Sequence, residues 1–317
     1  MIDILLTQPV PEAIDRQLLQ LYRVHRLHEA ADTAAFLAEH GGAIRAVVTG
    51  GAKGLPNAIM DRLPALQLIA ISGIGTDAVD LVHAAERGVQ VCTTPGVLTD
   101  DVADMALGLL IMTLRDLGTG ERIVRAGQWG QVNQPLARRV SGIDLGIIGL
   151  GRVGHAIAQR AKAFGMSIHY TDHKVQPDSG YHYEADILSL ARRCDVLVVA
   201  ASADQGEALI TTEVLQALGP QGYLINVARG RLVDEQALVK ALQERVIAGA
   251  GLDVFVDEPN VPPALYDLDN VVLQPHRGSA TAQTRLAMGE MVLENLKACF
   301  SGDPVPNAVQ VRTPQYL

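Results

Sequence analysis

The stretch from Gly142 to Lys174 limits the possible folds of this chain more than any other. A short apolar run at 145–148 leads into the glycine sequence GLGRVG at 149–154, a helical pattern follows, and a second apolar run ends at Asp172. Strand, tight turn, helix, strand and acid is the order of a dinucleotide-binding unit. The first glycine permits the turn, the second lets the backbone approach a pyrophosphate, and the third lets the helix pack closely on the strand.

Two further features of this stretch favour nucleotide binding. The helix N-terminus offers free N–H groups to phosphate, and Asp172 follows the last glycine at about the spacing, roughly 20 residues, expected of a ribose-binding acid. A purely structural glycine turn is the alternative, but the flanking elements agree with the nucleotide interpretation. The cofactor-binding residues predicted here are Gly149, Gly151, Arg152, Val153, Gly154 and Asp172.

Composition excludes several classes of partner. The chain has 317 residues, enough for two domains, and a formal net charge of −9. Nucleic acid and anionic membranes both require a basic face, so neither is expected as a partner. The three cysteines lack CxxC spacing and are interpreted as small buried residues of a reducing compartment, with no metal site. Neither a signal peptide nor an apolar run of ~18 residues is found, which predicts a cytoplasmic protein.

Strand and helix patterns alternate along the whole chain, which predicts parallel sheets covered on both faces. Residues 1–97 carry strand patterns without a glycine motif, and Thr93–Gly96 has the composition of a turn and hinge. One long helix is predicted from about 101 to 126, and it is expected to be buried because its stretch DMALGLLIMTL at 104–114 is apolar nearly all round. The last helix, 282–300, carries an apolar stripe that needs a partner surface and can return the chain to its first half.

Three polar side chains follow strands of the second half. Arg229 comes after the strand at 223–227, Glu258 follows the strand near 248–252, and His276 follows the strand near 270–273. Because ligands of open α/β sheets bind at the carboxyl ends of strands, these groups should converge near the dinucleotide. Reduction of a ketone needs a proton donor, for which histidine is suited. A carboxylate would stabilise the imidazolium, and an arginine would hold a substrate carboxylate and polarise its carbonyl.

Each of these residues also has a structural interpretation. His276 alone can be a hydrogen-bonded histidine at a sheet edge, Glu258 a solvated loop acid, and Arg229 a salt-bridge partner of Asp234 or Glu235. Their joint occurrence at three strand ends favours catalysis. The other histidines show no metal-ligand spacing, and most are assigned to the surface.

Long sequence blocks, in order, carry a resemblance to one family. They are TTPGVLTDDVADMALGLL at 93–110, GLGRVG at 149–154, INVARGRLVDEQAL at 225–238, GLDVFVDEP at 251–259 and PHRGSAT at 275–281. Over nearly its full length the chain resembles the D-isomer-specific 2-hydroxyacid dehydrogenases. The resemblance implies an α/β fold of two doubly wound parallel-sheet domains, with a Rossmann-type cofactor domain (98–285) inserted into a smaller flavodoxin-like substrate domain (1–97 plus 286–317). It also implies a homodimer, with the helix after Thr99 near the interface.

The resemblance implies a role for each matching residue. Arg229 would bind and polarise the 2-oxo acid, Glu258 would pair with the histidine, and His276 would be the acid/base. The turn at 72–75 would bind the substrate carboxylate through backbone N–H groups, most of all those of Ile74 and Gly75, with Gly73 as part of the turn. Asp253 would contact the nicotinamide. The remaining cofactor-binding residues implied are Thr99, Ala228 and Gly278.

Two positions depart from the family pattern. Arg277 stands beside His276 where an aliphatic residue is frequent. In the sequence YTDHK at 170–174, Asp172 would repel a 2′-phosphate and accept the ribose hydroxyls, while His173 and Lys174 are cations that can attract the phosphate. NAD(H) is therefore favoured, with NADP(H) as the alternative.

The sequence as a whole predicts an enzyme that reduces small 2-oxo acids to D-2-hydroxy acids. Glyoxylate and hydroxypyruvate are the first candidates, and bulkier phenylpyruvate-type acids are the second. A nucleotide-sensing, corepressor-like protein on the same fold is the non-enzymatic alternative, although such a protein would not need Arg229, Glu258 and His276. A formate or phosphonate dehydrogenase is disfavoured by the compact start of the chain.

Overall fold

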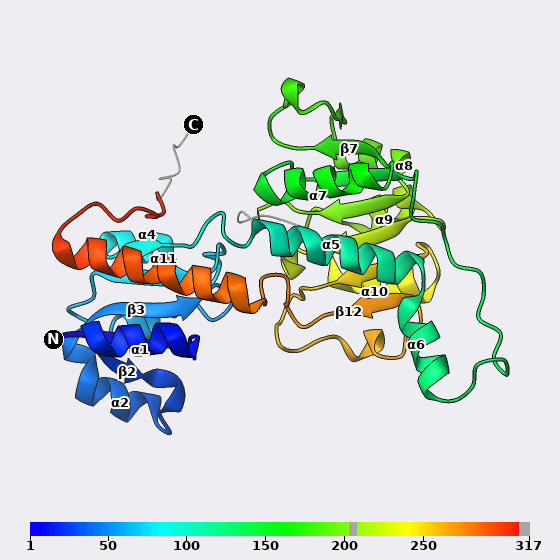
Figure 1. The fold of residues 1–317 in the computed structure, drawn as a ribbon. Coiled ribbons are helices and arrows are strands. Elements are labelled where there is room, and N and C mark those ends of the chain that lie inside the picture. The colour runs from blue at the N-terminus through cyan, green and yellow to red at the C-terminus, as the bar shows by residue number, and fades with distance from the viewer. Residues whose placement is uncertain (203–207, 311–317) are drawn as a thin grey trace. The chain divides into compact units, whose positions relative to one another are not determined.

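The computed structural model describes residues 1–202 and 208–310, which form two compact units. Unit 1 comprises Met1–Leu98 together with the described residues from Ala280 onward, and unit 2 comprises the described residues of Thr99–Ser279. Each unit has its own parallel sheet and its own apolar core (Figure 1).

The sheet of unit 1 has five parallel strands in the order β2-β1-β3-β4-β5. This is the flavodoxin-like order of a doubly wound fold. The strands are β1 (Ile2–Leu6), β2 (Tyr22–Arg26), β3 (Ile44–Gly50), β4 (Leu68–Ser72) and β5 (Gln90–Cys92).

Helices cover both faces of this sheet, because alternate strand residues point to opposite sides. Ile4 and Leu6 of β1 pack in one cluster with α1 and α11, whereas Leu5 packs in the other cluster with α2, α3 and α4. The helix α11 thus brings the end of the chain back onto the first sheet, where its apolar stripe is covered. The helices are α1 (Glu12–Leu21), α2 (Thr33–His40), α3 (Asn57–Met60), α4 (Leu81–Glu86) and α11 (Ala282–Ser301).

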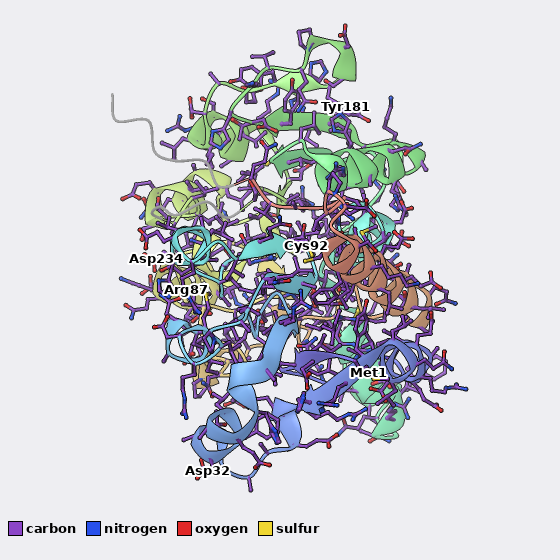
Figure 2. All side chains as sticks on the ribbon, turned by 90° about the vertical axis from the view of Figure 1, so that its left-hand side faces the viewer. Met1, Asp32, Arg87, Cys92, Tyr181 and Asp234 are labelled. Carbon is purple, nitrogen blue, oxygen red and sulfur yellow. The ribbon has the colours of Figure 1, made fainter. Side chains whose placement is uncertain are left out.

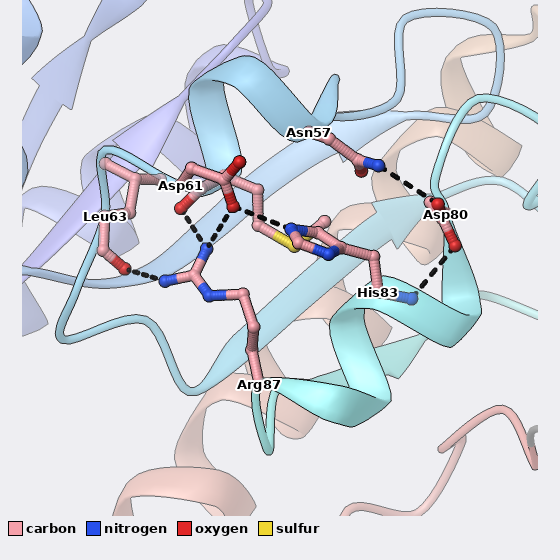
Figure 3. A network of polar contacts seen from close by, with 7 residues as sticks. Asn57, Asp61, Leu63, Asp80, His83 and Arg87 are labelled. Carbon is pink, nitrogen blue, oxygen red and sulfur yellow. Dashed lines mark hydrogen bonds and ion pairs between the residues drawn. The ribbon is translucent and has the colours of Figure 1, made fainter.

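A polar network ties α3 to α4 (Figure 3). Asp61 accepts a hydrogen bond from His83 Nε2 at 2.7 Å and lies 3.5 Å from Arg87 Nη1. Asp80 caps α4 by accepting from the His83 backbone N–H at 2.9 Å, and it also accepts from Asn57 Nδ2 at 3.0 Å. The turn at 72–75 lies in the chain between these two helices.

The sheet of unit 2 has seven parallel strands in the order β12-β11-β10-β9-β6-β7-β8. Read from β8, its first six strands follow the 3-2-1-4-5-6 order of a Rossmann sheet. The fold class predicted from the sequence is therefore confirmed for both units. The strands are β6 (Asp144–Ile148), β7 (Ser167–Thr171), β8 (His182–Tyr183), β9 (Val196–Val199), β10 (Tyr223–Asn226), β11 (Gly249–Leu252) and β12 (Val271–Leu273).

Two layers of helices enclose the unit 2 sheet (Figure 1). The layer of α8, α9 and α10 packs on one apolar cluster, and α5 packs on α7 and on β10 and β11. The helices are α5 (Thr99–Leu114), α6 (Leu117–Arg125), α7 (Arg152–Ala163), α8 (Ile187–Arg193), α9 (Thr212–Leu218) and α10 (Glu235–Gln243). Single 3-10 turns occur in both units at Leu27–Glu29, Gly41–Ala43, Pro177–Ser179, Gly230–Leu232 and Pro263–Leu265.

The prediction of a single long helix at 101–126 is wrong. The chain forms α5, then interrupts it at Asp116, whose φ of 48° lies in the left-handed region that aspartate tolerates better than most residues. The following helix, α6, has no buried residue. The apolar run at 104–114, on which the prediction of burial rested, lies within α5, and only α5 is packed into the core.

The cysteines are unpaired thiols, as expected from their spacing. Cys92, labelled in Figure 2, and Cys194 are buried, and Cys299 is half-buried. Burial raises the pKa of the Cys92 and Cys194 thiols to about 12, so both remain protonated and unreactive near neutral pH. Among the described residues, no helix has the length and apolar character that crossing a membrane requires.

Candidate active site

The glycine turn at the start of α7 has one open position between two crowded ones. Gly149 has a φ of +87°, and a Cβ atom there would lie 2.5 Å from Ala201 Cα. A Cβ at Gly154 would lie 2.1 Å from the carbonyl oxygen of Gly149, so the helix can pack this closely only on glycine. A Cβ at Gly151 would meet no described atom within 4 Å, and no side chain caps the helix there. This open, uncapped N-terminus fits a phosphate group.

The segment after β7 holds this turn from the other side. Asp172, which is half-buried, accepts hydrogen bonds from the backbone N–H of Leu150 at 2.8 Å and of His173 at 2.6 Å. Gln176 donates from Nε2 to the Leu150 carbonyl at 2.9 Å, and its own backbone N–H donates to the Tyr170 hydroxyl at 2.8 Å. Gln176 was not predicted, because its contact joins segments 26 residues apart. The acid at the end of β7 is thus fixed beside the glycine turn.

His276 and Glu258 are in direct contact. The Nδ1 atom of His276 lies 2.6 Å from Glu258 Oε2, and the other carboxylate oxygen accepts from the Phe255 N–H at 3.1 Å. Burial disfavours the charged form of Glu258, but the hydrogen bonds from His276 and Phe255 and the nearby charges of His276 and Arg229 outweigh burial, so its pKa lies below the ordinary value. The carboxylate is therefore ionised near neutral pH and can stabilise a protonated imidazole.

Asp253 fixes the backbone that carries His276. His276 has a φ of 52°, in the left-handed region that non-glycine residues occupy mainly where the surroundings enforce it. Its N–H donates to the Asp253 carbonyl at 2.8 Å, while the Asp253 carboxylate accepts from the N–H groups of Arg277 at 2.6 Å and Gly278 at 2.7 Å. Asp253 is 1% exposed, and burial raises its pKa despite these hydrogen bonds. The carboxylate predicted to contact nicotinamide is thus also the support of the histidine turn.

The loop after β10 places Arg229 against the loop that carries Glu258. Asn226, at the end of β10, donates from Nδ2 to the Arg229 carbonyl at 2.9 Å and accepts from the Ala228 N–H at 3.1 Å. Arg229 donates from Nη1 to the Ala228 carbonyl at 2.6 Å. A Cβ at Gly230 would lie 2.0 Å from the Phe255 carbonyl carbon, so the two loops touch at a glycine. Asn226 was not predicted, although an asparagine at a strand end is a known turn signal.

The predicted substrate turn lies in unit 1, at the end of β4. Gly73 has a φ of +154°, and its N–H donates to Thr94 Oγ1 at 2.9 Å. The N–H groups of Ile74 and Gly75 make no hydrogen bond to any residue that the structure describes, and Ile74 is exposed. Two adjacent N–H groups without a partner in the described chain can donate hydrogen bonds to a carboxylate.

The remaining predicted cofactor residues lie in unit 2. The Thr99 Oγ1 atom is buried and has no hydrogen-bond partner within the described chain, so it is available to a ligand. Ala228 is buried in the loop after β10, and Gly278 is buried against Asp253. Arg152 is exposed and Val153 half-buried in the first turn of α7. Arg277 has an exposed side chain and contacts Asp253 through its backbone.

Comparison with known proteins agrees with this geometry. Residues 107–278 match the family described as D-isomer specific 2-hydroxyacid dehydrogenase, NAD binding domain. The chain is 43% identical to a 2-ketogluconate reductase of Gluconobacter oxydans, over 94% of this chain and 96% of the relative. It is 42% identical to a hydroxyphenylpyruvate reductase of Plectranthus scutellarioides, over 96% and 97%.

A solved structure extends the agreement to three dimensions. The NADPH-dependent glyoxylate/hydroxypyruvate reductase of Sinorhizobium meliloti, solved with NADP and malonate, is 42% identical and superposes with a TM-score of 0.90. The match covers 97% of this chain and 96% of that structure. This protein therefore belongs to the D-isomer-specific 2-hydroxyacid dehydrogenase family.

Proposed function

We propose that this protein reduces small 2-oxo acids to D-2-hydroxy acids with a reduced nicotinamide cofactor, and that glyoxylate and hydroxypyruvate are its first substrates. The contact between His276 and Glu258 at 2.6 Å, on the loops after the strands of a Rossmann sheet, carries the proposal. A protein that only senses nucleotide could lose this pair, whereas this chain keeps it. Residues 98–285 would bind the cofactor, and residues 1–97 with 286–317 would bind the substrate.

His276 delivers the proton in this proposal. Its Nδ1 faces Glu258, which leaves Nε2 to donate to the substrate oxygen. The lowered pKa of Glu258 keeps that carboxylate charged, so it favours the protonated imidazole before the reaction and holds the ring in one orientation afterwards. Asp253 supports the backbone of the histidine turn without touching the imidazole in this proposal.

The substrate is held by charge and by backbone N–H groups. The guanidinium of Arg229 can bind the carboxylate through its forked N–H donors while polarising the 2-oxo group. The free N–H groups of Ile74 and Gly75 supply a second set of donors for the carboxylate. A bulkier 2-oxo acid is the alternative substrate, and the relative named hydroxyphenylpyruvate reductase supports testing it.

The cofactor residues fit a dinucleotide, whose nicotinamide would supply the hydride. Gly149, Gly151 and Gly154 leave the uncapped start of α7 open to the pyrophosphate, and the buried Thr99 hydroxyl is a free donor. We propose NADH over NADPH because Asp172 places a carboxylate beside the glycine turn, where it would repel a 2′-phosphate. A relative of known structure uses NADPH, so both cofactors belong in the test.

We also propose that the protein is a cytoplasmic homodimer. The segment from α6 to residue 136 supports a second copy as partner, because it exposes large apolar side chains, including Trp129 at 83% exposure. These residues are Leu117, Val124, Trp129, Val132 and Leu136. Light scattering should give twice the monomer mass, and replacing Trp129 by serine should weaken the dimer; a monomeric wild type would contradict this part of the proposal.

The experiment that tests the function is a substrate panel. Loss of the reduced nicotinamide absorbance is followed with NADH and with NADPH, using glyoxylate, hydroxypyruvate, 2-ketogluconate and hydroxyphenylpyruvate. The proposal predicts turnover of glyoxylate or hydroxypyruvate and a D product. Cofactor binding without turnover of any acid would instead favour the nucleotide-sensing alternative.

A further inference from the structure

Thr94 forms hydrogen bonds with both the N–H and the carbonyl of Gly73, a residue of the predicted substrate turn. It lies just after β5, at the start of the predicted hinge, and its side chain is fully buried. The Thr94 hydroxyl accepts from the Gly73 N–H at 2.9 Å and lies 3.3 Å from the Gly73 carbonyl oxygen, to which it can donate. The Thr94 backbone N–H donates to the same carbonyl at 2.8 Å.

These contacts decide which N–H groups of the turn remain for a ligand. Because Thr94 occupies the Gly73 N–H, the first free donors are those of Ile74 and Gly75. Gly73 has a φ of +154°, a conformation that side-chain-bearing residues rarely adopt, and the Thr94 contacts hold it there. The Gly73 carbonyl and the Ile74 N–H belong to one planar peptide, so the bonds to this carbonyl set the direction of the Ile74 N–H, and the Gly75 N–H is the next along the chain.

We propose that Thr94 is a positioning residue for the substrate carboxylate: it fixes Gly73 so that the Ile74 and Gly75 N–H groups point at one anion. This inference rests on the proposed function, since it assigns the turn to the carboxylate of the 2-oxo acid. Thr94 itself does not touch the substrate. Its hydroxyl occupies the Gly73 N–H, which would otherwise compete for the carboxylate, and its bonds to Gly73 orient the N–H groups of Ile74 and Gly75.

Valine is the most informative substitution at this position, because its side chain keeps the branched shape of threonine but neither accepts nor donates a hydrogen bond. In Thr94→Val the Gly73 N–H loses its acceptor, and the turn rearranges to find another. Loss of one hydrogen bond to a charged carboxylate raises KM for the 2-oxo acid by about 10-fold to 100-fold. Because the acid/base residues are in unit 2, kcat at saturating substrate should change by less than about 3-fold.

The matched control is Thr93→Val. Thr93 is the neighbouring buried threonine, and its hydrogen bond is made by its backbone N–H to the Asn307 carbonyl at 3.2 Å, away from the turn. Thr94→Ser is the rescue variant, because it restores a hydroxyl. Both should bind 2-oxo acid as the wild type does. Cofactor affinity, measured from NADH fluorescence, should be the same in all four proteins.

A binding measurement separates this inference from the proposed function. Oxamate, a 2-oxo acid analogue that is not reduced, is titrated calorimetrically into each NADH-loaded protein. Weaker oxamate binding in Thr94→Val alone, with recovery in Thr94→Ser, supports the inference even where no 2-oxo acid turns over. Equal oxamate affinity and equal KM in Thr94→Val and wild type would overturn it while leaving the reductase function intact. A wild type that binds no oxamate and reduces no acid would overturn both.

Discussion

Replacing Glu258 by glutamine tests the partner of the predicted acid/base. Glutamine preserves the shape and one acceptor oxygen but removes the charge that lies 2.6 Å from His276 Nδ1. A hydrogen bond between charged groups contributes about 1.5–3 kcal/mol net, and the neutral amide keeps only a part of it. Since each 1.36 kcal/mol is a factor of ten in rate, loss of about half of this energy should lower kcat for 2-oxo acid reduction by about 4-fold to 13-fold.

The assay is steady-state oxidation of NADH by the best 2-oxo acid, with Glu235→Gln as the matched control. Glu235 accepts a hydrogen bond from the Val256 N–H at 3.1 Å, much as Glu258 accepts from the Phe255 N–H, and no contact joins it to His276 in the described residues. The control should keep its kcat within about 2-fold. If Glu258→Gln also kept the wild-type kcat, the charge on Glu258 would play no part in catalysis, and the reasoning would be refuted.

Three further predictions follow from the same geometry. Gly154→Ala should destabilise unit 2 by about 1–3 kcal/mol in urea unfolding because its Cβ would lie 2.1 Å from a carbonyl oxygen, whereas Gly151→Ala should fold normally and lose affinity for the dinucleotide. Asp172→Asn, which keeps an acceptor for the Leu150 N–H, should raise the NADPH to NADH ratio of kcat/KM by about 10-fold, and an unchanged ratio would exclude Asp172 as the specificity residue. Because the pKa of Glu258 is lowered in the folded state, its contribution to the free energy of unfolding should be present above its ordinary pKa of 4.5 and vanish as the pH falls through the lowered value; a wild-type minus Glu258→Gln difference that persists at the lowest pH would contradict this.

The elements that are specified locally could be predicted from the sequence. The glycine turn and α7 follow from the spacing of three glycines, and the structure shows why two of those positions admit no side chain. The closeness of Glu258 and His276 follows from the rule that parallel strands end at one edge of a sheet, since these residues come after β11 and β12.

The contacts that set the precise geometry could not be predicted. Whether an acid such as Asp253 turns toward a ligand or toward the backbone of Arg277 and Gly278 depends on loop conformations about 25 residues apart. The hydrogen bonds between Thr94 and Gly73 likewise depend on the conformations of two loops, which lie 21 residues apart in the chain. The break at Asp116 was missed because the expected helix was continued past the apolar run at 104–114 into the polar, glycine-containing stretch at 115–121.

Replacing His276 by alanine removes the proposed proton donor. We expect kcat for 2-oxo acid reduction to fall by about 10²-fold to 10⁴-fold, the range for loss of a general acid, while NADH binding stays within about 2-fold of the wild type, because the imidazole is not among the predicted cofactor contacts. A variant that turns over 2-oxo acids at the wild-type rate would contradict the assignment of His276 as the proton donor and, with it, the mechanism built on its contact with Glu258.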